Sequence, residues 1–161
     1  MKVITVWQPW ASLIAIGAKP YEFRGWIPPA SLIDKRIGIH AGARPIKRIE
    51  VATLIQQLGD ETNEGLPCLR KDIALPFLTR VYNSLLDGIE ILPRSHILCT
   101  GVLGTPKSGE ECAAEFGIEA GNDSDRDGTF NWGWPITDIQ DLEPPIPFRG
   151  AQGFWNWSGT P

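Results

Sequence analysis

The alternation of apolar and polar positions along the chain predicts a mixture of strands and helices. Residues 1–6 alternate and are rich in β-branched side chains, which is typical of a strand. From Trp10 the apolar residues follow helical spacing, and Gly17 is a natural end for that helix because it tolerates a left-handed backbone. The same patterns predict strands at 21–26, 36–41 and 96–103 and helices at 45–58, 75–86 and 110–116.

The later part of the chain predicts further strand structure with an interruption. Residues 129–134 and 136–138 have strand character, and Pro135 separates them. Because proline has no N–H to donate to a strand ladder, we expect the strand to break there. The chain contains no internal repeat and no linker, so a single domain over residues 1–161 is the simplest interpretation.

The composition is that of an ordinary folded protein and argues against several other classes. Hydrophobic residues make up 42% and charged residues 21% of the 161 residues, which disfavours a disordered chain. The apolar stretches are too short to span a bilayer, and Gln8 and Pro9 interrupt the first one before it could serve as a signal peptide. We therefore expect a cytoplasmic protein that does not enter a membrane.

Neither a cofactor nor a metal is expected from the residue types present. The three cysteines form no CxxC pair and two histidines are too few for a zinc cluster, so we expect free and mostly buried thiols. Residues 123–128 resemble the first half of a calcium-binding EF-hand loop, but the last ligand position would fall on Trp134. An acidic surface turn explains these residues equally well.

Charge is unevenly distributed along the chain. The net charge of −4 argues against a protein that coats nucleic acid by bulk electrostatics. Basic residues nevertheless crowd between Lys35 and Arg48, whereas residues 110–127 are mostly acidic. Arg44 and Arg48 are predicted to share a face at the start of a helix. They would form either a rim that contacts phosphates or an ordinary solvated surface.

The candidate site with the most chemical content consists of Lys19, Glu22 and Arg24. Lys19 lies in the predicted turn after the first helix, and Glu22 and Arg24 share one face of the strand that follows. A carboxylate beside a guanidinium fixes its orientation and leaves the other N–H groups for a phosphate or carbonyl oxygen. The alternative is a surface ion pair that contributes little to stability.

The string G-x-K-x-x-E-x-R at residues 17–24 resembles the signature of ASCH domains, which are β-barrels related to the PUA family. Residues 8–11, 37–41, 96–103 and 147–157 are similar to other segments of that family. The resemblance implies an α+β fold, namely a PUA-like β-barrel with flanking helices. The segment at about 50–93 is not matched and is expected to be a helical insertion.

For function, the resemblance implies a cleft whose charged floor binds RNA, a nucleotide or a nucleoside. His40 is a further candidate, and a hydrogen-bonded histidine lining the barrel is the alternative role for it. Trp26 and Trp134 are candidate stacking residues because they flank the motif strand and a late strand, although core packing is the default role of tryptophan. The predicted ligand-binding residues are Lys19, Glu22, Arg24, Trp26, His40, Arg44, Arg48 and Trp134.

The resemblance also leaves an enzyme and a protein-interaction module as alternatives. One group of similar domains hydrolyses N4-acetylcytidine and others cut single-stranded RNA, so Lys19 and Glu22 are the candidate catalytic residues. However, Glu22 stands where the acetylcytidine hydrolases have a threonine, so their mechanism cannot simply be transferred. Whether this protein is an enzyme stays open on the sequence alone. The acidic loop and the insertion could instead serve a protein partner.

Overall fold

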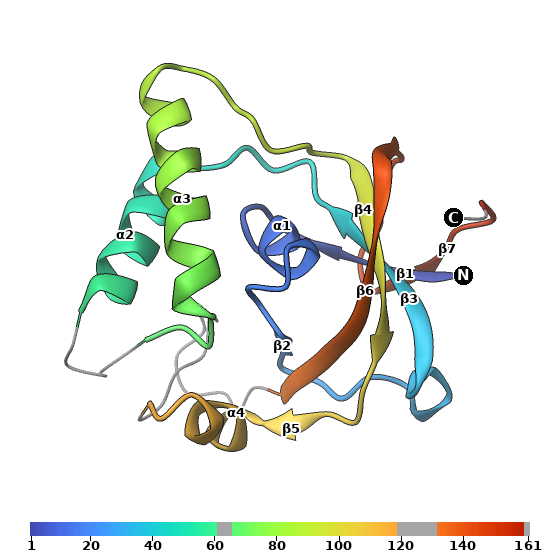
Figure 1. The fold of residues 1–161 in the computed structure, drawn as a ribbon. Helices are drawn as coiled ribbons and strands as arrows, with labels where there is room; N and C mark the ends of the chain where they lie inside the picture. The colour runs from blue at the N-terminus through green and yellow to red at the C-terminus, as the bar shows by residue number, and fades with distance from the viewer. Residues whose placement is uncertain (61–65, 119–131, 160–161) are drawn as a thin grey trace.

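The computed structural model describes residues 1–60, 66–118 and 132–159 of the chain. Within these ranges the strands of one curved sheet lie beside four α-helices and a short 3-10 turn, η1 (Ala30–Leu32) (Figure 1). The strands are β1 (Lys2–Val6), β2 (Tyr21–Arg24), β3 (Lys35–Ala41), β4 (His96–Leu103), β5 (Lys107–Ser108), β6 (Trp132–Pro147) and β7 (Phe154–Asn156). The helices are α1 (Trp10–Ala15), α2 (Arg48–Gly59), α3 (Lys71–Leu86) and α4 (Gly109–Glu115).

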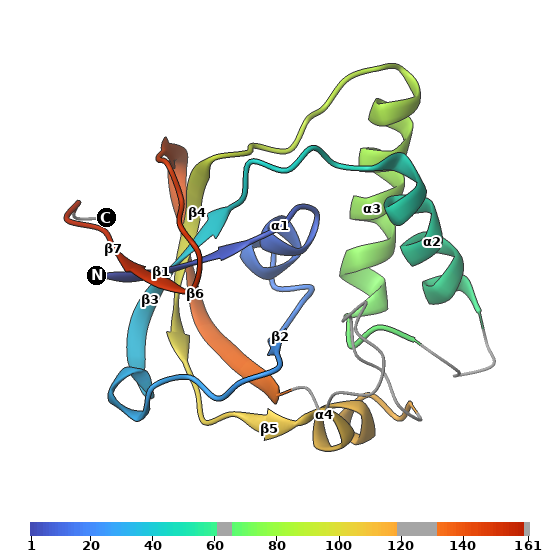
Figure 2. The same cartoon turned by 180° about the vertical axis from the view of Figure 1, so that it is seen from behind.

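The sheet has the strand order β2-β6-β4-β3-β1-β7, and β5 pairs with β6 outside this sequence of neighbours. β1 and β3 are parallel, with Val3 opposite Gly38, and the other pairs are antiparallel. The long β6 pairs with β2 at its start and with β4 over the rest, and the sheet curls into a half-barrel (Figures 1 and 2). The predicted α+β class, with a barrel-like sheet and flanking helices, is confirmed.

Alternate residues of the strands build a core on the inner side of the sheet, as their period of two requires. Ile4 of β1, Ile39 of β3 and Trp134 of β6 belong to this core and are almost inaccessible to water. Ala11 and Ile14 of α1 pack against them. Helix α1 therefore lies on the concave side of the half-barrel (Figure 1).

Helices α2 and α3 form a second layer, and α1 lies between them and the sheet (Figures 1 and 2). Leu54 of α2 packs with Leu78 and Val81 of α3, and Leu13 of α1 belongs to the same cluster. These two helices occupy most of the segment 50–93, in which a helical insertion is predicted. Because α1 contributes to both cores, it ties the helical pair to the sheet.

Strand β6 runs without a break through Pro135, so the predicted interruption is wrong. The strand changes its partner at this point, because Tyr21 of β2 lies opposite Pro135 and Leu103 of β4 lies opposite Ile136. The carbonyl of Pro135 accepts a hydrogen bond from the N–H of Gly104 at 2.8 Å. Because the Pro135 carbonyl keeps this bond, the strand continues through Pro135 although the proline has no N–H to donate.

The predicted helices are in the right places, but three of them begin elsewhere. α2 begins at Arg48 and not at 45, α3 begins at Lys71 and not at 75, and α4 begins at Gly109 and not at 110. All three cysteines are buried free thiols, as predicted. No helix in the described ranges is both long enough and apolar enough to cross a membrane.

Candidate functional site

Lys19, Glu22 and Arg24 form one connected charged cluster. Gly17 ends α1 with a φ of 74°, and the N–H of Lys19 then bonds the carbonyl of Leu13 at 2.9 Å. β2 places Glu22 and Arg24 on the same face. The Glu22 carboxylate accepts from Arg24 Nη2 at 2.8 Å and lies 3.6 Å from Lys19 Nζ. The structure therefore brings together the three residues that the sequence predicts to converge.

Arg24 is the member of this cluster that reaches the solvent. Lys19 and Glu22 are 2% and 5% exposed, whereas 28% of the Arg24 side chain is exposed. Lys19 Nζ donates to the carbonyl of Tyr21 at 2.5 Å and lies 5.1 Å from the ring centre of Phe23. A cleft floor open to solvent at all three residues is therefore wrong for this structure, because Lys19 and Glu22 are paired inside the protein.

Arg24 bridges the gap between β2 and β1. Its Nη2 donates to the carbonyl of Thr5 at 2.8 Å, although β1 and β2 are not neighbours in the sheet. Its Nε is buried and has no hydrogen-bond partner in the described part of the chain. Among the same residues, no hydrogen bond uses Nη1 of Arg24. The guanidinium is thus held through Nη2, and Nη1 is the nitrogen that carries donors for a ligand.

The two tryptophans predicted to stack on a ligand have different environments. Trp134 is 0% exposed, and its ring lies parallel to that of Phe154 with 5.6 Å between the ring centres. Trp26 is 41% exposed and packs edge-on against Trp134, with 4.7 Å between the ring centres. The prediction for Trp134 is therefore wrong, because its ring belongs to the core. Trp26 keeps an accessible surface.

His40 lies on the outer side of the sheet, away from the motif residues. Ile37 and Ile39 point into the inner core, so His40 points to the opposite side of β3. Its Nε2 donates to the carbonyl of Phe148 at 2.9 Å, and its Nδ1 is buried without a hydrogen-bond partner in the described residues. Burial lowers the pKa of His40. The alternative of a hydrogen-bonded histidine fits these contacts, but its predicted position inside the barrel is wrong.

Arg44 and Arg48 do not share a helix face, because α2 begins only at Arg48. The Arg44 guanidinium forms two hydrogen bonds with the Glu50 carboxylate, one of them at 3.2 Å from Nη1. The same guanidinium lies 4.5 Å from the ring centre of Trp7. Arg48 is exposed at the first turn of the helix. The predicted basic rim therefore consists of one ordered guanidinium and one solvated side chain.

The sequence analysis missed a second charged cluster, formed by Tyr21, Lys107 and Glu115. The Tyr21 hydroxyl donates to the Glu115 carboxylate, and Lys107 forms an ion pair with the same carboxylate. The contacts with Lys107 and Tyr21 lower the pKa of Glu115, whereas burial and the contact with Glu115 raise the pKa of Tyr21. The three residues come from β2, β5 and α4, so no local spacing could have indicated them.

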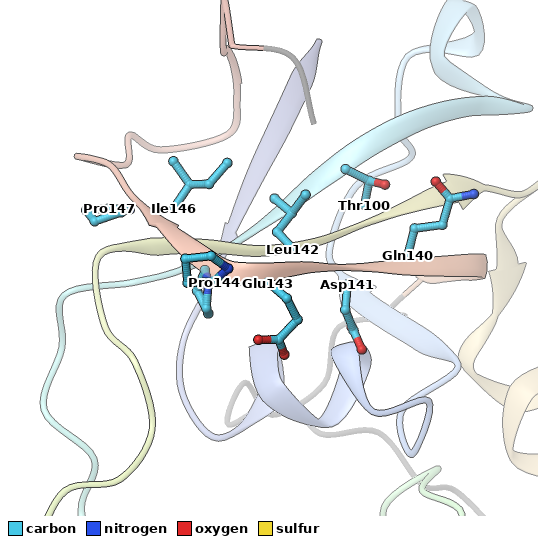
Figure 3. Close-up of a pocket in the computed structure, with 9 residues that line it drawn as sticks. Thr100, Gln140, Asp141, Leu142, Glu143, Pro144, Ile146 and Pro147 are labelled. Atoms are coloured by element: carbon cyan, nitrogen blue, oxygen red, sulfur yellow. The ribbon is translucent and has the colours of Figure 1, made fainter.

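Two surface depressions lie outside the predicted site. A groove of about 510 Å³ follows the second half of β6, and in Figure 3 the side chains of Asp141 and Glu143 extend to the same side of this strand. It is lined by Thr100, Gln140, Asp141, Leu142, Glu143, Pro144, Pro145, Ile146 and Pro147. A second depression of about 420 Å³ is lined by Ala43, Glu90, Leu92, Arg94 and Ser95. Neither contains a residue of the motif.

The metal prediction can be examined only in part. In the described ranges, no group of three histidine, cysteine, aspartate or glutamate side chains could hold a metal ion. The calcium-like segment 123–128 lies outside the described residues.

Comparisons with known proteins give structural neighbours only. No protein-family model and no curated protein matches the chain. The fold is similar to the crystal structure of ASCH from Zymomonas mobilis, with a TM-score of 0.48, 19% sequence identity, and coverage of 91% of this chain and 72% of that one. Two mutant structures of the same protein match with TM-scores of 0.47 and 0.46 and identities of 19% and 17%, again over 91% of this chain, and over 72% and 74% of theirs.

Proposed function

We propose that this chain is an RNA- or nucleotide-binding domain of the ASCH type and that Arg24 is the group that meets the ligand. The observation that carries the proposal is the arrangement of the charged cluster: Lys19 and Glu22 are buried, and Arg24 is partly exposed. Removing two charged groups from water costs several kcal/mol per ion, which pairing only partly offsets. Buried ionisable groups with a specific charge partner are one of the features that mark a candidate functional site.

The geometry of Arg24 indicates which ligand groups it would bind. Nη2 is occupied by Glu22 and by the carbonyl of Thr5, so the orientation of the planar guanidinium is fixed. Nη1 then offers its N–H groups to an anionic or carbonyl oxygen, whereas Nε is buried. Phosphates and the oxygen atoms of bases are the groups that an arginine fork binds best. With one carboxylate and two cations, the cluster also carries a net positive charge.

Binding assays with Arg24 variants test this proposal. Fluorescence anisotropy would measure the affinity for a labelled single-stranded RNA of mixed sequence, and calorimetry would measure the affinity for each of the four nucleoside monophosphates. Arg24→Ala should weaken the tightest ligand about ten- to a hundredfold, since a hydrogen bond from a charged donor contributes about 1.5–3 kcal/mol. Arg24→Lys keeps the charge but loses the fork, so its loss should be intermediate.

The control for these measurements is Arg80→Ala, because Arg80 is exposed on α3, in the layer beyond α1. Circular dichroism and the melting temperature of each variant separate a loss of binding from a loss of fold. The proposal is overturned if the wild-type protein binds neither RNA nor any nucleotide at low salt. It is also overturned if folded Arg24→Ala binds as tightly as Arg80→Ala.

A hydrolase acting in the same site is a second candidate function. The observation that favours it is the buried position of Lys19, whose Nζ lies 3.6 Å from a carboxylate oxygen of Glu22. A paired amine and carboxylate in a site shielded from water can serve acid and base steps. Incubation with N4-acetylcytidine and with single-stranded RNA, followed by chromatography, tests for turnover. Product that forms with the wild-type protein and not with Lys19→Met would establish it, and the absence of any product would leave a binding domain.

A further inference from the structure

The outer side of β1 and β3 carries aromatic side chains next to basic ones. Ile4 and Val6 point into the inner core, so Thr5 between them points outward. A Cβ atom placed on Gly42, which follows β3, would lie 3.0 Å from the Trp7 ring and 3.4 Å from the Thr5 methyl group. Thr5 and Trp7 are therefore neighbours on this outer side.

Residues 148–155, which lead into β7 and include its first two residues, continue the same surface. Trp155 Nε1 donates to the Thr5 hydroxyl at 3.1 Å, and the Trp155 ring stacks on Phe148 with 5.2 Å between the ring centres. A Cβ atom on Gly150 would come within 2.3 Å of the His40 ring, so the backbone of this segment lies directly on β3. Gly42 and Thr5 thus lie between Trp7 and the stacked pair of Trp155 and Phe148.

The rings at the two ends of this series are exposed although their surroundings are ordered. Trp7 is 54% exposed and Phe148 is 38% exposed. The backbone of Phe148 is fixed on both sides, because its N–H bonds Ser95 at 2.9 Å and its carbonyl accepts from His40 at 2.9 Å. Rings held in this way can receive a ligand with little loss of side-chain entropy.

Basic groups accompany both exposed rings. The Arg44 guanidinium lies 4.5 Å from the ring centre of Trp7 and is held by Glu50, and Arg149 follows Phe148 with an exposed side chain. We call this surface the aromatic-basic strip; it consists of Trp7, Arg44, Phe148, Arg149 and Trp155. Glu50 balances the charge of Arg44, so the positive excess beside the exposed rings comes from Arg149 and contrasts with the net charge of −4 of the whole chain.

We propose that the aromatic-basic strip binds single-stranded RNA, with bases stacked on Trp7 and Phe148 and phosphates bound by Arg44 and Arg149. Unpaired bases offer ring faces, and the backbone offers anions, which is the chemistry that such a surface complements. The proposal rests on the proposed function and extends it from one group to a strand.

Thr5 provides the physical connection between the strip and the motif. Its carbonyl accepts from Arg24 Nη2 at 2.8 Å, and its hydroxyl accepts from Trp155 of the strip. Trp7 follows two residues later, which is about 7 Å along an extended chain. Arg24 and Trp7 are therefore attached to the same short stretch of chain, so one strand could contact both.

The test is the affinity of the full chain for a labelled single-stranded 12-nucleotide RNA, measured by anisotropy. Trp7→Ala and Phe148→Ala should each weaken binding about five- to a hundredfold, as base stacking on an aromatic ring predicts. Ile89→Ala is the matched control, because Ile89 is a large apolar residue that is 57% exposed, bonds Ser84 at the end of α3 and does not belong to the strip. The same RNA annealed to its complement should bind at least about tenfold more weakly, since paired bases cannot stack on the rings.

Each outcome of this test has a defined meaning. If the RNA binds and Arg24→Ala weakens it, while folded Trp7→Ala and Phe148→Ala match Ile89→Ala, then the strip proposal is overturned and the proposed function stands. Equal affinity for the duplex would also overturn it, and so would a poly-glutamate peptide that competes as well as RNA. If the wild-type protein binds no RNA and no nucleotide, the proposed function fails first and the strip proposal falls with it.

Discussion

Replacing Glu22 by glutamine should reveal how much of the stability depends on the buried charged cluster. The Glu22 carboxylate faces Arg24 Nη2 at 2.8 Å and Lys19 Nζ at 3.6 Å. Without its negative charge, the buried Lys19 ammonium keeps the carbonyl of Tyr21 but loses the charged oxygen 3.6 Å away. Breaking a buried ion pair in this way typically lowers the free energy of unfolding by about 3–5 kcal/mol.

The melting temperature should fall accordingly. In a domain of this size each kcal/mol corresponds to about 2–4 °C, so Glu22→Gln should melt about 6–20 °C below the wild-type protein. Glu143→Gln is the matched control because Glu143 is an exposed carboxylate on β6. Urea denaturation followed by circular dichroism gives the two free energies directly.

The double variant Lys19→Met with Glu22→Gln decides the cause of the loss. If the instability of Glu22→Gln comes from a buried ammonium that no longer faces the Glu22 charge, then removing that ammonium as well should restore a large part of the lost free energy. A Glu22→Gln protein that unfolds within about 0.5 kcal/mol of Glu143→Gln would refute the reasoning. A double variant that is less stable by the sum of the two single losses would do the same.

Three further changes test other parts of the structure. Gly150→Ala should lower the free energy of unfolding by about 1–3 kcal/mol, because its Cβ would meet the His40 ring at 2.3 Å. The control Gly25→Ala, whose Cβ would have no atom within 4 Å, should unfold in urea like the wild-type protein. Burial lowers the pKa of His40 from 6.5, so below this pH the unfolded chain binds more protons than the folded one, and the free energy of unfolding should fall as the pH drops below about 6.5. In His40→Gln, the urea midpoint should depend less on pH in this range. Arg149→Ala should reduce the salt slope of RNA binding by about 0.7 without changing the melting temperature, because Arg149 is an exposed cation of the aromatic-basic strip; an unchanged slope would remove this residue from the interface.

Residue spacing predicts the inner side of the sheet well but fails where distant segments meet. The apolar residues Ile37 and Ile39 define a strand and a buried face, and both are correct because burial repeats with a period of two. The same alternation could have placed His40 on the opposite face. The break predicted at Pro135 is wrong because β6 changes from one partner strand to another there. The carbonyl of Pro135 bonds Gly104, which lies far away in sequence, so local spacing does not show this contact.

The candidate site shows the same division. The turn at Gly17 and the alternation of β2 bring Lys19, Glu22 and Arg24 together, as local spacing predicts. Their exposure could not be predicted, because it depends on how the surrounding elements pack. The sequence does not distinguish Trp26 from Trp134, and only the packing of the folded chain makes Trp134 a core residue and leaves Trp26 partly exposed.

The different exposure of the three charged residues indicates a division of roles within the cluster. Lys19 contacts Glu22 and the backbone carbonyl of Tyr21, and Glu22 contacts both Lys19 and Arg24. Their charges therefore orient neighbouring groups more readily than they bind a ligand. Arg24 is fixed by Glu22 on one side and by the Thr5 carbonyl on β1. An arginine oriented from two directions loses little entropy when it binds, so the buried pair would improve affinity without touching the ligand.

Because Thr5 also accepts a hydrogen bond from Trp155 of the aromatic-basic strip, the position of the guanidinium and that of the exposed rings depend on the same strand, β1. Recognition by the charged motif and by the rings would then be coupled through β1.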